Sequence, residues 1–317
     1  MILCVGLSPA LGRVIELQSL SPGEVNRANS YLEVAAGKAT NAARVARQLG
    51  HPATVVSPLG EESASYYRSL AEADGVQIRG AEYPGRIRWA ITLLDPENGA
   101  TEVVVNEPQP VPAEAAEALE ESARTAMEEA TACLVAGSRL PNLPRELLVK
   151  ISRAAIEAEV PLFLDIREED LEAVLEELAR ARAPDSRARE GAKGGGVVVK
   201  VNEEEFLDTL RLLEGQNAGV RELSEELLGD FARKHRCVVV VTRGGEPVLY
   251  ASETGEHGNV PVSPVAARNP IGSGDTFLAT LAVRLLEQRR LPEAVRDATA
   301  MAGKNATFLR PGTVLAP

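Results

Sequence analysis

Short runs of valine, isoleucine and leucine alternate along this 317-residue chain with longer stretches whose apolar residues recur at helical spacing. A short run that is apolar at every position is typical of a strand buried on both faces, and a strand followed by a helix is typical of a parallel βαβ unit. The alternation predicts an α/β fold in which helices cover both faces of a mostly parallel sheet. The expected strands cover 2–7, 53–57, 132–136, 161–165, 197–201 and 237–242. The expected helices lie near 40–49, 61–74, 112–130, 144–159, 168–182, 203–213, 220–235, 274–290 and 292–309.

Two stretches, 12–36 and 84–108, interrupt this rhythm because they contain short alternating pieces and no helix of their own. We expect these pieces to be strands that pair into a small sheet over the active-site edge, where the sheet would act as a lid. Trp89, the only tryptophan, lies on the second stretch and is expected to pack in the core or at a subunit interface rather than against a ligand. The whole chain, 1–317, is expected to form one domain that includes the lid.

Charge and cysteine content restrict the partners and the compartment. The formal net charge of −12 argues against nucleic acid or an anionic membrane surface as the main partner. Each of the three cysteines lies in or beside a short apolar run, so we expect buried, inert thiols. The chain has no apolar stretch of about 18 residues and no basic, apolar leader, and a cytoplasmic location is therefore expected. The glycine-rich segment 182–196 predicts a surface loop.

Residues 269–280 read Asn-Pro-Ile-Gly-Ser-Gly-Asp-Thr-Phe-Leu-Ala-Thr, a glycine-rich turn followed by an acid at the start of a predicted helix. Gly272 and Gly274 lack a Cβ, so the backbone can turn its N–H groups toward an anion, and the helix N-terminus adds further unpaired N–H groups. A carboxylate beside a bound phosphate makes chemical sense if Asp275 receives a proton from an attacking alcohol. Ser273 or Asp275 could instead simply cap the helix, and the motif alone does not separate the two interpretations.

Two further segments carry groups that suit phosphate and metal chemistry. Gly37, Lys38 and Asn41 open a predicted helix and could hold phosphate and hydroxyl oxygens together, although an ordinary capped helix start explains the same pattern. Asn202 and Glu205 follow a predicted strand and could hold waters around Mg²⁺, although Asn followed three residues later by Glu is also a capping box.

Arg86 and Arg88 lie on the second lid stretch. Either guanidinium would suit an anionic substrate, and an exposed strand edge is the simpler interpretation of both.

Taken in order, these segments resemble the ribokinase-like (PfkB) sugar kinase family over essentially the whole chain, and most closely its 1-phosphofructokinase and tagatose-6-phosphate kinase branch. The segments that carry the resemblance are Leu7-Ser8-Pro9-Ala10-Leu11, Val25-Asn26-Arg27, Gly37-Lys38, Gly137-Ser138, Asn202-x-x-Glu205 and Asn269-Pro-Ile-Gly-Ser-Gly-Asp275. The last is the most specific, and the others gain weight from occurring together in the family's order. The resemblance implies a three-layer αβα sandwich with a β-sheet lid, which is often the dimer contact in this family.

The same resemblance implies a role for each candidate residue. Asp275 looks like the general base, and Gly272, Ser273 and Gly274 look like the anion hole around the γ-phosphoryl group. Asn202 and Glu205 look like the pair that organises Mg²⁺ through water. The implied nucleotide-side residues are Lys200, Thr242, Gly244 and Asn305, and the implied acceptor-side residues are Gly37, Lys38, Asn41 and Arg86. Of these, Lys38 and Arg86 match positions that hold the phosphate of a phosphosugar.

The acceptor side departs from the family's pattern. An Asp usually follows Asn-Pro-Ala-Leu and holds sugar hydroxyls, whereas Gly12 stands here and has no side chain to bond them. Losing such a contact typically costs about 1–3 kcal/mol. The twin glycines before the lysine read Ala36-Gly37, Ala39 replaces the next glycine, Lys-Pro-Asn reads Lys200-Val201-Asn202, and Ser-Leu-Gly reads Thr242-Arg243-Gly244. An intact transfer end with an altered acceptor end favours a changed or relaxed acceptor over an inactive protein.

We therefore expect an ATP-dependent kinase that transfers the γ-phosphoryl group to a primary alcohol of a sugar or sugar phosphate and uses ATP and Mg²⁺. Two alternatives stay open: a kinase of an unphosphorylated sugar, a nucleoside or a vitamin-like alcohol, and a nucleotide-binding regulatory protein that has lost transfer. A dinucleotide oxidoreductase is disfavoured because no Gly-x-Gly-x-x-Gly follows the first strand. The acceptor, the monovalent-ion requirement and the oligomeric state are not determined by the sequence.

Overall fold

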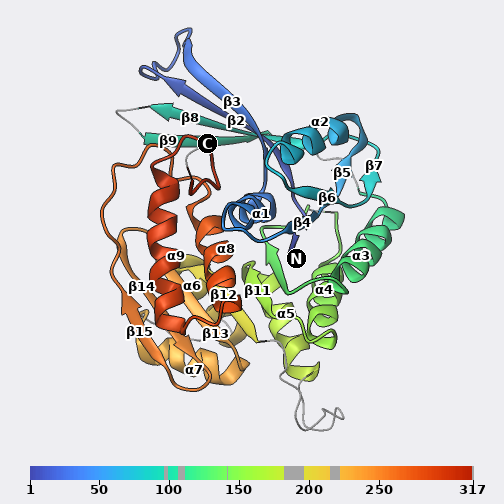
Figure 1. The fold of residues 1–317 in the computed structure, drawn as a ribbon, viewed down its shortest axis with the longest axis vertical. Coiled ribbons are helices and arrows are strands. Elements are labelled where there is room, and N and C mark those ends of the chain that lie inside the picture. Colours follow the sequence, from blue (N-terminus) through green and yellow to red (C-terminus); the bar gives the residue numbers. More distant parts are fainter. Residues whose placement is uncertain (96–98, 106–110, 141, 182–195, 215–221, 316–317) are drawn as a thin grey trace.

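A computed structural model of the chain describes residues 1–95, 99–105, 111–140, 142–181, 196–214 and 222–315. Within these residues a nine-stranded sheet forms the centre of the molecule (Figure 1). Its strands follow the order β15 (His257–Val260), β14 (Glu246–Ser252), β13 (Val238–Arg243), β12 (Val197–Asn202), β11 (Leu162–Asp165), β10 (Ala132–Ala136), β1 (Ile2–Val5), β4 (Ala53–Val56) and β6 (Gln77–Arg79). The strands from β13 to β6 pair in parallel, whereas β14 and β15 add an antiparallel edge.

The central strands are apolar on both faces, as the sequence predicts. In β1, Leu3 and Val5 pack into one hydrophobic cluster, and Ile2 and Cys4 pack into a second cluster on the opposite face of the sheet. All four side chains are fully buried. This is the burial pattern of a strand that lies between two layers of helices.

Helices cover both faces of the sheet, which confirms the three-layer αβα sandwich (Figure 1). One layer contains α1 (Lys38–Gln48), α2 (Glu61–Glu72), α8 (Ser273–Leu286) and α9 (Leu291–Ala306). The other contains α3 (Ala113–Met127), α4 (Arg145–Glu157), α5 (Glu168–Ala181), α6 (Glu203–Glu214) and α7 (Glu225–His235). α8 contacts both α1 and α9, and every residue from Asp275 to Val283 is buried. Packing against α1 and α9 therefore fixes the position of α8.

The two stretches predicted to form a lid do form a separate small sheet. β2 (Ala10–Leu17) and β3 (Ala28–Ala36) come from the first stretch, and β8 (Arg88–Asp95) and β9 (Gly99–Val105) come from the second. They pair in the order β3-β2-β8-β9, and the sheet projects from the body at the top of Figure 1. The end of the second predicted stretch, 106–108, lies outside the described residues.

Trp89 packs against other residues of the protein, as predicted. It is half-buried and lies against the cluster formed under α1 and α8. The guanidinium carbon of Arg13 lies 4.7 Å from the centre of its ring, in a cation–π contact.

Some short elements and boundaries were not predicted. β14 and β15 form the antiparallel edge of the central sheet, and β15, the edge strand, has only one buried residue, Val260, so it carries no apolar run. β5 (Leu59–Gly60) and β7 (Glu82–Tyr83) pair over two residues each, too few to produce a periodic pattern. α7 begins at Glu225 rather than near 220, because the Ser224 hydroxyl accepts a hydrogen bond from the N–H of Leu227 and caps the helix there. Residues 182–195 of the predicted loop lie outside the described residues.

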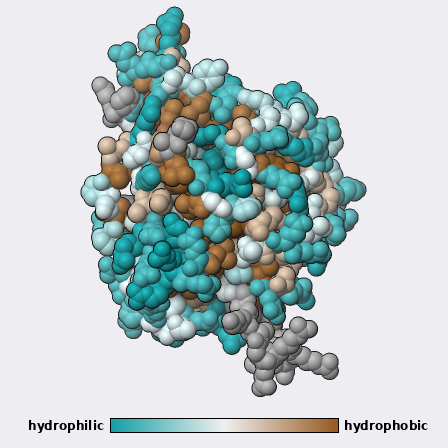
Figure 2. Space-filling view, in the orientation of Figure 1, coloured by the Kyte–Doolittle hydropathy of each residue, from teal (hydrophilic) through white to brown (hydrophobic). Residues whose placement is uncertain are grey.

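Surface and thiol properties agree with the composition. The face drawn in Figure 2 is mainly hydrophilic, with hydrophobic residues gathered between the lid and the body. Cys4, Cys133 and Cys237 are buried, as predicted, and form no disulfide among the described residues, and burial raises the pKa of Cys133 to about 12. Among the described residues, no helix has both the length and the apolar character needed to cross a membrane.

Candidate active site

A cavity of about 480 Å³ lies between the lid and the carboxyl ends of the parallel strands. Ligands of open α/β sheets bind at this edge. The predicted site residues that line the cavity are Gly37, Lys38, Asn41, Lys200, Asn202, Glu205, Thr242, Gly272, Ser273, Gly274 and Asp275. The fold therefore joins segments that lie far apart in the chain, such as the helix starts of α1 and α8.

The glycine-rich turn leaves the N-terminus of α8 open toward the cavity. Gly272 has a φ of 84°, in the left-handed region, and a Cβ there would lie 2.9 Å from the amide nitrogen of Gly312. Both the conformation and the space thus require glycine. Among the described residues no side chain caps the helix, so the N–H groups of Gly274 and Asp275 have no intrahelical acceptor. With the positive end of the helix dipole, these groups are suited to bind an anion.

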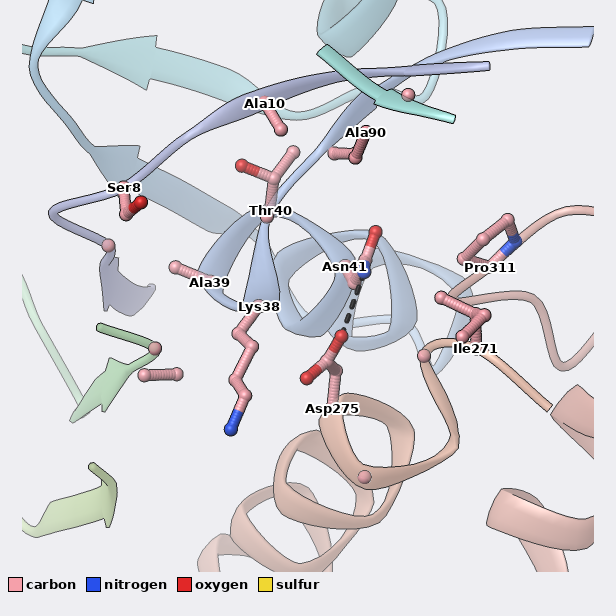
Figure 3. A pocket seen from close by; sticks show the side chains of 18 of the residues that line it. Ser8, Ala10, Lys38, Ala39, Thr40, Asn41, Ala90, Ile271, Asp275 and Pro311 are labelled. Carbon is pink, nitrogen blue, oxygen red and sulfur yellow. Dashed lines mark hydrogen bonds between the residues drawn. The ribbon is translucent and has the colours of Figure 1, made fainter. Parts of the chain in front are cut away.

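Asp275 extends from the first turn of α8 and is 6% exposed. Its Oδ2 accepts a hydrogen bond of 2.8 Å from Nδ2 of Asn41 on α1 (Figure 3). Burial raises the pKa of Asp275 to about 6, an effect that the nearby Lys38 ammonium partly offsets. The carboxyl is therefore charged at neutral pH and accepts a proton more readily than an ordinary aspartate.

A buried arginine fixes the orientation of the Asn41 amide. Arg44 donates one hydrogen bond of 2.8 Å to Oδ1 of Asn41 and another of 2.9 Å to the carbonyl of Pro311, and its Nε donates to Asp74 at 2.7 Å. A guanidinium only donates, so it selects the oxygen of the amide and turns the NH₂ group toward Asp275. Oδ2 of Asp275 is thereby bound, and Oδ1 is left to receive a proton.

Asp165, for which no role was predicted, joins the two lysines of the site. Its Oδ1 accepts a hydrogen bond from Nζ of Lys38 and its Oδ2 accepts one from Nζ of Lys200, each at 2.9 Å. Burial acts to raise the pKa of Asp165, but the two ammonium groups outweigh it and hold the pKa below its ordinary value. The signal that could have identified this residue is an acid at the last position of a buried parallel strand, on the edge where ligands bind.

Lys38, predicted to hold the acceptor's phosphate, lines the cavity. Its side chain points away from Ala10 and Ala90 on the lid strands (Figure 3) and ends at Asp165. Burial acts to lower the pKa of Lys38, but the surrounding carboxylates, Asp165 first, raise it. The cause of this orientation is electrostatic, because a buried carboxylate at the strand end attracts the ammonium away from the lid.

Lys200 lies directly over the open N-terminus of α8. A Cβ built on Gly274 would lie 2.9 Å from Nζ of Lys200, so the ammonium can approach the helix only because this position is glycine. The Lys200 side chain is 5% exposed, and its ammonium is bound to Asp165. Backbone amides and one buried cation are therefore available here to bind an anion.

Asn202 and Glu205 form the capping box that their spacing also suggests. The Asn202 N–H donates to Oε2 of Glu205 at 3.0 Å, and the Glu205 N–H donates to Oδ1 of Asn202 at 2.8 Å. Both residues line the cavity, and the capping box uses only one carboxylate oxygen of Glu205. Oε1 therefore suits a hydrated Mg²⁺, which takes one or two carboxylates and keeps several waters. The described residues contain no cluster of three or more His, Cys, Asp or Glu side chains that could bind a metal without such waters or phosphates.

Three predicted site residues do not line the cavity. Arg86 pairs with Glu62 on the outer surface, and Arg88, two residues farther on, lines the cavity instead. Arg88 is the first residue of β8, whereas Arg86 precedes the strand, so the alternation of side chains along β8 does not place Arg86 on the same face. Gly244 lies in the exposed turn between β13 and β14, with a φ of 62°.

Asn305 is fully buried and links two backbone segments rather than reaching a ligand. Its Nδ2 donates to the Ile271 carbonyl and to the Ser273 hydroxyl, and its Oδ1 accepts from the N–H groups of Gly312 and Thr313. All of its hydrogen-bonding capacity is used in this way. Asn305 thus joins the glycine-rich turn to the segment at Gly312 and Thr313 and does not line the cavity.

Comparisons with known proteins agree with this architecture. The family described as pfkB family carbohydrate kinase matches residues 2–313. Phosphofructokinase-2 from Escherichia coli in complex with substrates and products superposes with a TM-score of 0.78 at 20% identity, over 96% of this chain and 93% of that one. A possible 1-phosphofructokinase from Thermotoga maritima gives 0.77 at 18% identity over 98% and 93%. A putative ribokinase from Agrobacterium tumefaciens gives 0.74 at 19% identity over 99% and 93%.

Proposed function

Because the chain belongs to the pfkB family of carbohydrate kinases, we propose that it transfers the γ-phosphoryl group of ATP to a primary alcohol of a sugar or sugar phosphate. One observation carries the proposal. A buried carboxyl group, Asp275, lies in the first turn of a helix whose N–H groups are open to an anion. A base beside an anion site is the arrangement that phosphoryl transfer to an alcohol needs.

The proposed step uses Asp275 as the proton acceptor. The O–H bond of the alcohol breaks and its proton passes to Oδ1 of Asp275, while the alcohol oxygen forms a bond to the γ-phosphorus. The bond between the γ-phosphorus and the bridging oxygen of ADP breaks. The N–H groups at the start of α8 and the Lys200 ammonium stabilise the charge on the phosphoryl oxygens during this transfer.

The remaining cavity residues would hold the nucleotide and the metal. A Mg²⁺ held at Glu205 and Asn202 through water would neutralise charge on the phosphate oxygens. Thr242 lies at the end of β13 on the same edge of the sheet, and its hydroxyl donates to the carbonyl of Val201. We propose that Lys38, held by Asp165, contacts the transferring phosphoryl group rather than a phosphate of the acceptor.

A screen for ATP consumption tests the proposal. The purified protein with Mg²⁺ and ATP is expected to form ADP only when an alcohol acceptor is added from a panel of fructose 1-phosphate, fructose 6-phosphate, tagatose 6-phosphate, free hexoses, ribose, nucleosides and simple primary alcohols. The product is identified as a phosphate monoester by mass spectrometry. ATP binding without ADP formation on any acceptor would instead support a regulatory protein that has lost transfer.

The pKa of Asp275 predicts the acid side of the pH profile. Asp275 must be deprotonated to accept the proton, so kcat/KM is expected to rise with pH up to about 6 and then to level off. Asn41→Ala removes a hydrogen bond that lowers this pKa, and the rising limb is therefore expected to move to higher pH. Initial rates measured between about pH 5 and 8 give the rising limb for the wild type and for Asn41→Ala. An unchanged limb in Asn41→Ala would show that another group controls it.

An unphosphorylated acceptor is the second candidate, and a specific observation favours it. Lys38 and Arg86 are the two cations expected to hold a phosphosugar, and neither side chain is directed at the lid side of the cavity. Fructose 6-phosphate and fructose in the same screen separate the two candidates.

The lid also supports a proposal about assembly. Tyr31 and Val103 lie on the lid strands with 65% and 47% of their surface exposed. The strand pairing places both residues on the same face of the lid, where they could contribute to an interaction surface. We propose that the whole chain folds as one domain and pairs with a second copy through the lid, which sedimentation analysis would test.

A further inference from the structure

The lid presents one face to the cavity, and the pairing of its strands arranges that face in rows. Gly12 pairs with Val34 on one side and with Ala90 on the other, and Ala90 pairs with Val104. All four residues line the cavity. This apolar row, Val34–Gly12–Ala90–Val104, crosses the whole lid and carries no side chain that can form a hydrogen bond.

The apolar row is closely packed at Gly12. A Cβ at this position would lie 2.7 Å from Cγ2 of Val34 and 2.9 Å from Cβ of Ala36. Val34 and Ala36 thus fill the space that a polar side chain would need. The absence of a hydroxyl-binding group at Gly12 is therefore part of the local packing of the lid.

A second apolar wall lies opposite the lid. Ile271 and Pro311 both line the cavity, and they lie beside Asn41 and Asp275 with Ala90 on the other side (Figure 3). An alcohol whose hydroxyl reaches Asp275 must therefore pass between two apolar surfaces. Such a slot favours a flat apolar group.

Three polar side chains near this slot each use a hydrogen bond within the protein. Thr40 shares a hydrogen bond of 2.6 Å with the Tyr67 hydroxyl, and the Ser57 hydroxyl donates to the Gly6 carbonyl. The Asn41 amide makes one hydrogen bond at each end, to Asp275 and from Arg44. Sugar hydroxyls buried against the apolar row would lose bonds to water and gain no partner from its four residues' side chains, which weakens binding.

Polar groups lie in the two rows of residues that flank the apolar row. Arg88 lies in one flanking row, and its Nε is buried without a hydrogen-bond partner among the described residues. Thr92 and Glu102 lie in the row on the other side, where the Thr92 hydroxyl donates to the carboxylate at 3.4 Å. The site therefore suits a ligand with an apolar middle and a polar substituent at one end.

We propose that the acceptor is a hydroxymethyl group carried on a flat, largely apolar ring with one polar substituent, rather than a polyhydroxylated sugar. This rests on the function proposed above and changes only the acceptor. The O–H bond of the hydroxymethyl group breaks, its proton passes to Asp275, its oxygen bonds the γ-phosphorus, and the bond from that phosphorus to ADP breaks. The ring lies on the apolar row, and its substituent meets Arg88 or Glu102.

Matched acceptors and variants test this proposal. The probes are benzyl alcohol, 3-(hydroxymethyl)pyridine, fructose 6-phosphate and ribose, each with Mg²⁺ and ATP. The expected kcat/KM is higher for a ring alcohol than for either sugar by about tenfold or more. Ala90→Asn and the isosteric Val104→Thr add a polar group to the apolar row, and each is expected to reduce this preference by about tenfold. Val103→Thr adds the same hydroxyl on the opposite face of β9 and is expected to leave the preference unchanged.

Binding is measured separately, by ligand-observed NMR with a non-hydrolysable ATP analogue, so that the acceptor proposal can fail or stand by itself. Efficient phosphorylation of a sugar, with the ring alcohols inferior in both binding and turnover, would overturn the proposal and leave the kinase function intact. Preferential binding of ring alcohols that is lost in Val104→Thr, without transfer to any acceptor, would support the apolar row as a ring-binding surface and overturn the kinase function. Equal effects of Val103→Thr and Val104→Thr would also overturn it.

Discussion

Replacing Asp275 with Asn is expected to lower kcat by about 10²- to 10⁴-fold and to leave the affinity for ATP nearly unchanged. Asparagine keeps the shape of the side chain and a hydrogen bond to Asn41, but it cannot accept a proton. The anion site is made by the backbone of α8 and by Lys200, neither of which is altered. Steady-state kinetics with the best acceptor and calorimetric titration with an ATP analogue measure the two quantities.

The same variant is expected to be more stable than the wild type at neutral pH. Because the pKa of Asp275 rises from 3.8 in the unfolded chain to about 6 in the fold, the free energy of unfolding falls as pH rises between these values. Asparagine avoids this cost, so the Tm of Asp275→Asn should exceed that of the wild type at pH 7 and approach it near pH 4. Asp230→Asn, in an exposed pair with Arg233, is the control. Near-normal turnover in Asp275→Asn would exclude its role as the base.

Replacing Asp165 with Asn is expected to lower the free energy of unfolding by about 3–5 kcal/mol, because the buried Lys200 ammonium loses its carboxylate partner, whereas Lys38, whose side chain is 39% exposed, keeps contact with water. In this variant, Lys38 and Lys200 lose their charged partner at position 165, and each can bind at most the neutral amide there. Both ammonium groups are then free to move away from the cavity, and turnover is expected to fall with stability. Urea denaturation and steady-state kinetics measure these effects.

The pH dependence of stability identifies the cause. The pKa of Asp165 is held low in the fold, so its contribution is present at neutral pH and is lost as the pH falls through the acidic range. Asp165→Asn should therefore lack this acid-dependent loss, whereas Asp208→Asn, in a surface pair with Arg211, should keep it. Equal stability of Asp165→Asn and the wild type at pH 7 would show that the two lysines do not depend on this carboxylate.

The fold was predictable because its signals are local. A strand buried on both faces must be apolar at consecutive positions, as in β1, and a helix between two such strands must carry a periodic apolar face. The lid was predictable for the opposite reason, since its alternating segments contain no helix between them. Boundaries were less certain where one hydrogen bond decides them, as Ser224 does for α7.

The site residues were predictable only where a reactive side chain and the backbone that positions it lie in the same short segment. Gly272, Gly274 and Asp275 form such a segment, and the structure brings them together at one helix start. Arg86 and Arg88 differ by two positions, and only the tertiary structure decides which one enters the cavity. Asn305 resembled a ligand-binding residue in sequence, yet its partners, from Ile271 to Thr313, are known only when the chain is folded.

The order of strands and helices, the lid and the helix-start anion motif were all determined by the sequence itself, because propensity, periodicity and glycine conformation act over a few residues. The tertiary structure alone decided that Asp165 holds two lysines, that Lys38 turns from the lid, and that four strands form one apolar row. These features depend on contacts between residues far apart in the chain. Burial and Coulombic attraction there are set by neighbours that no local pattern specifies.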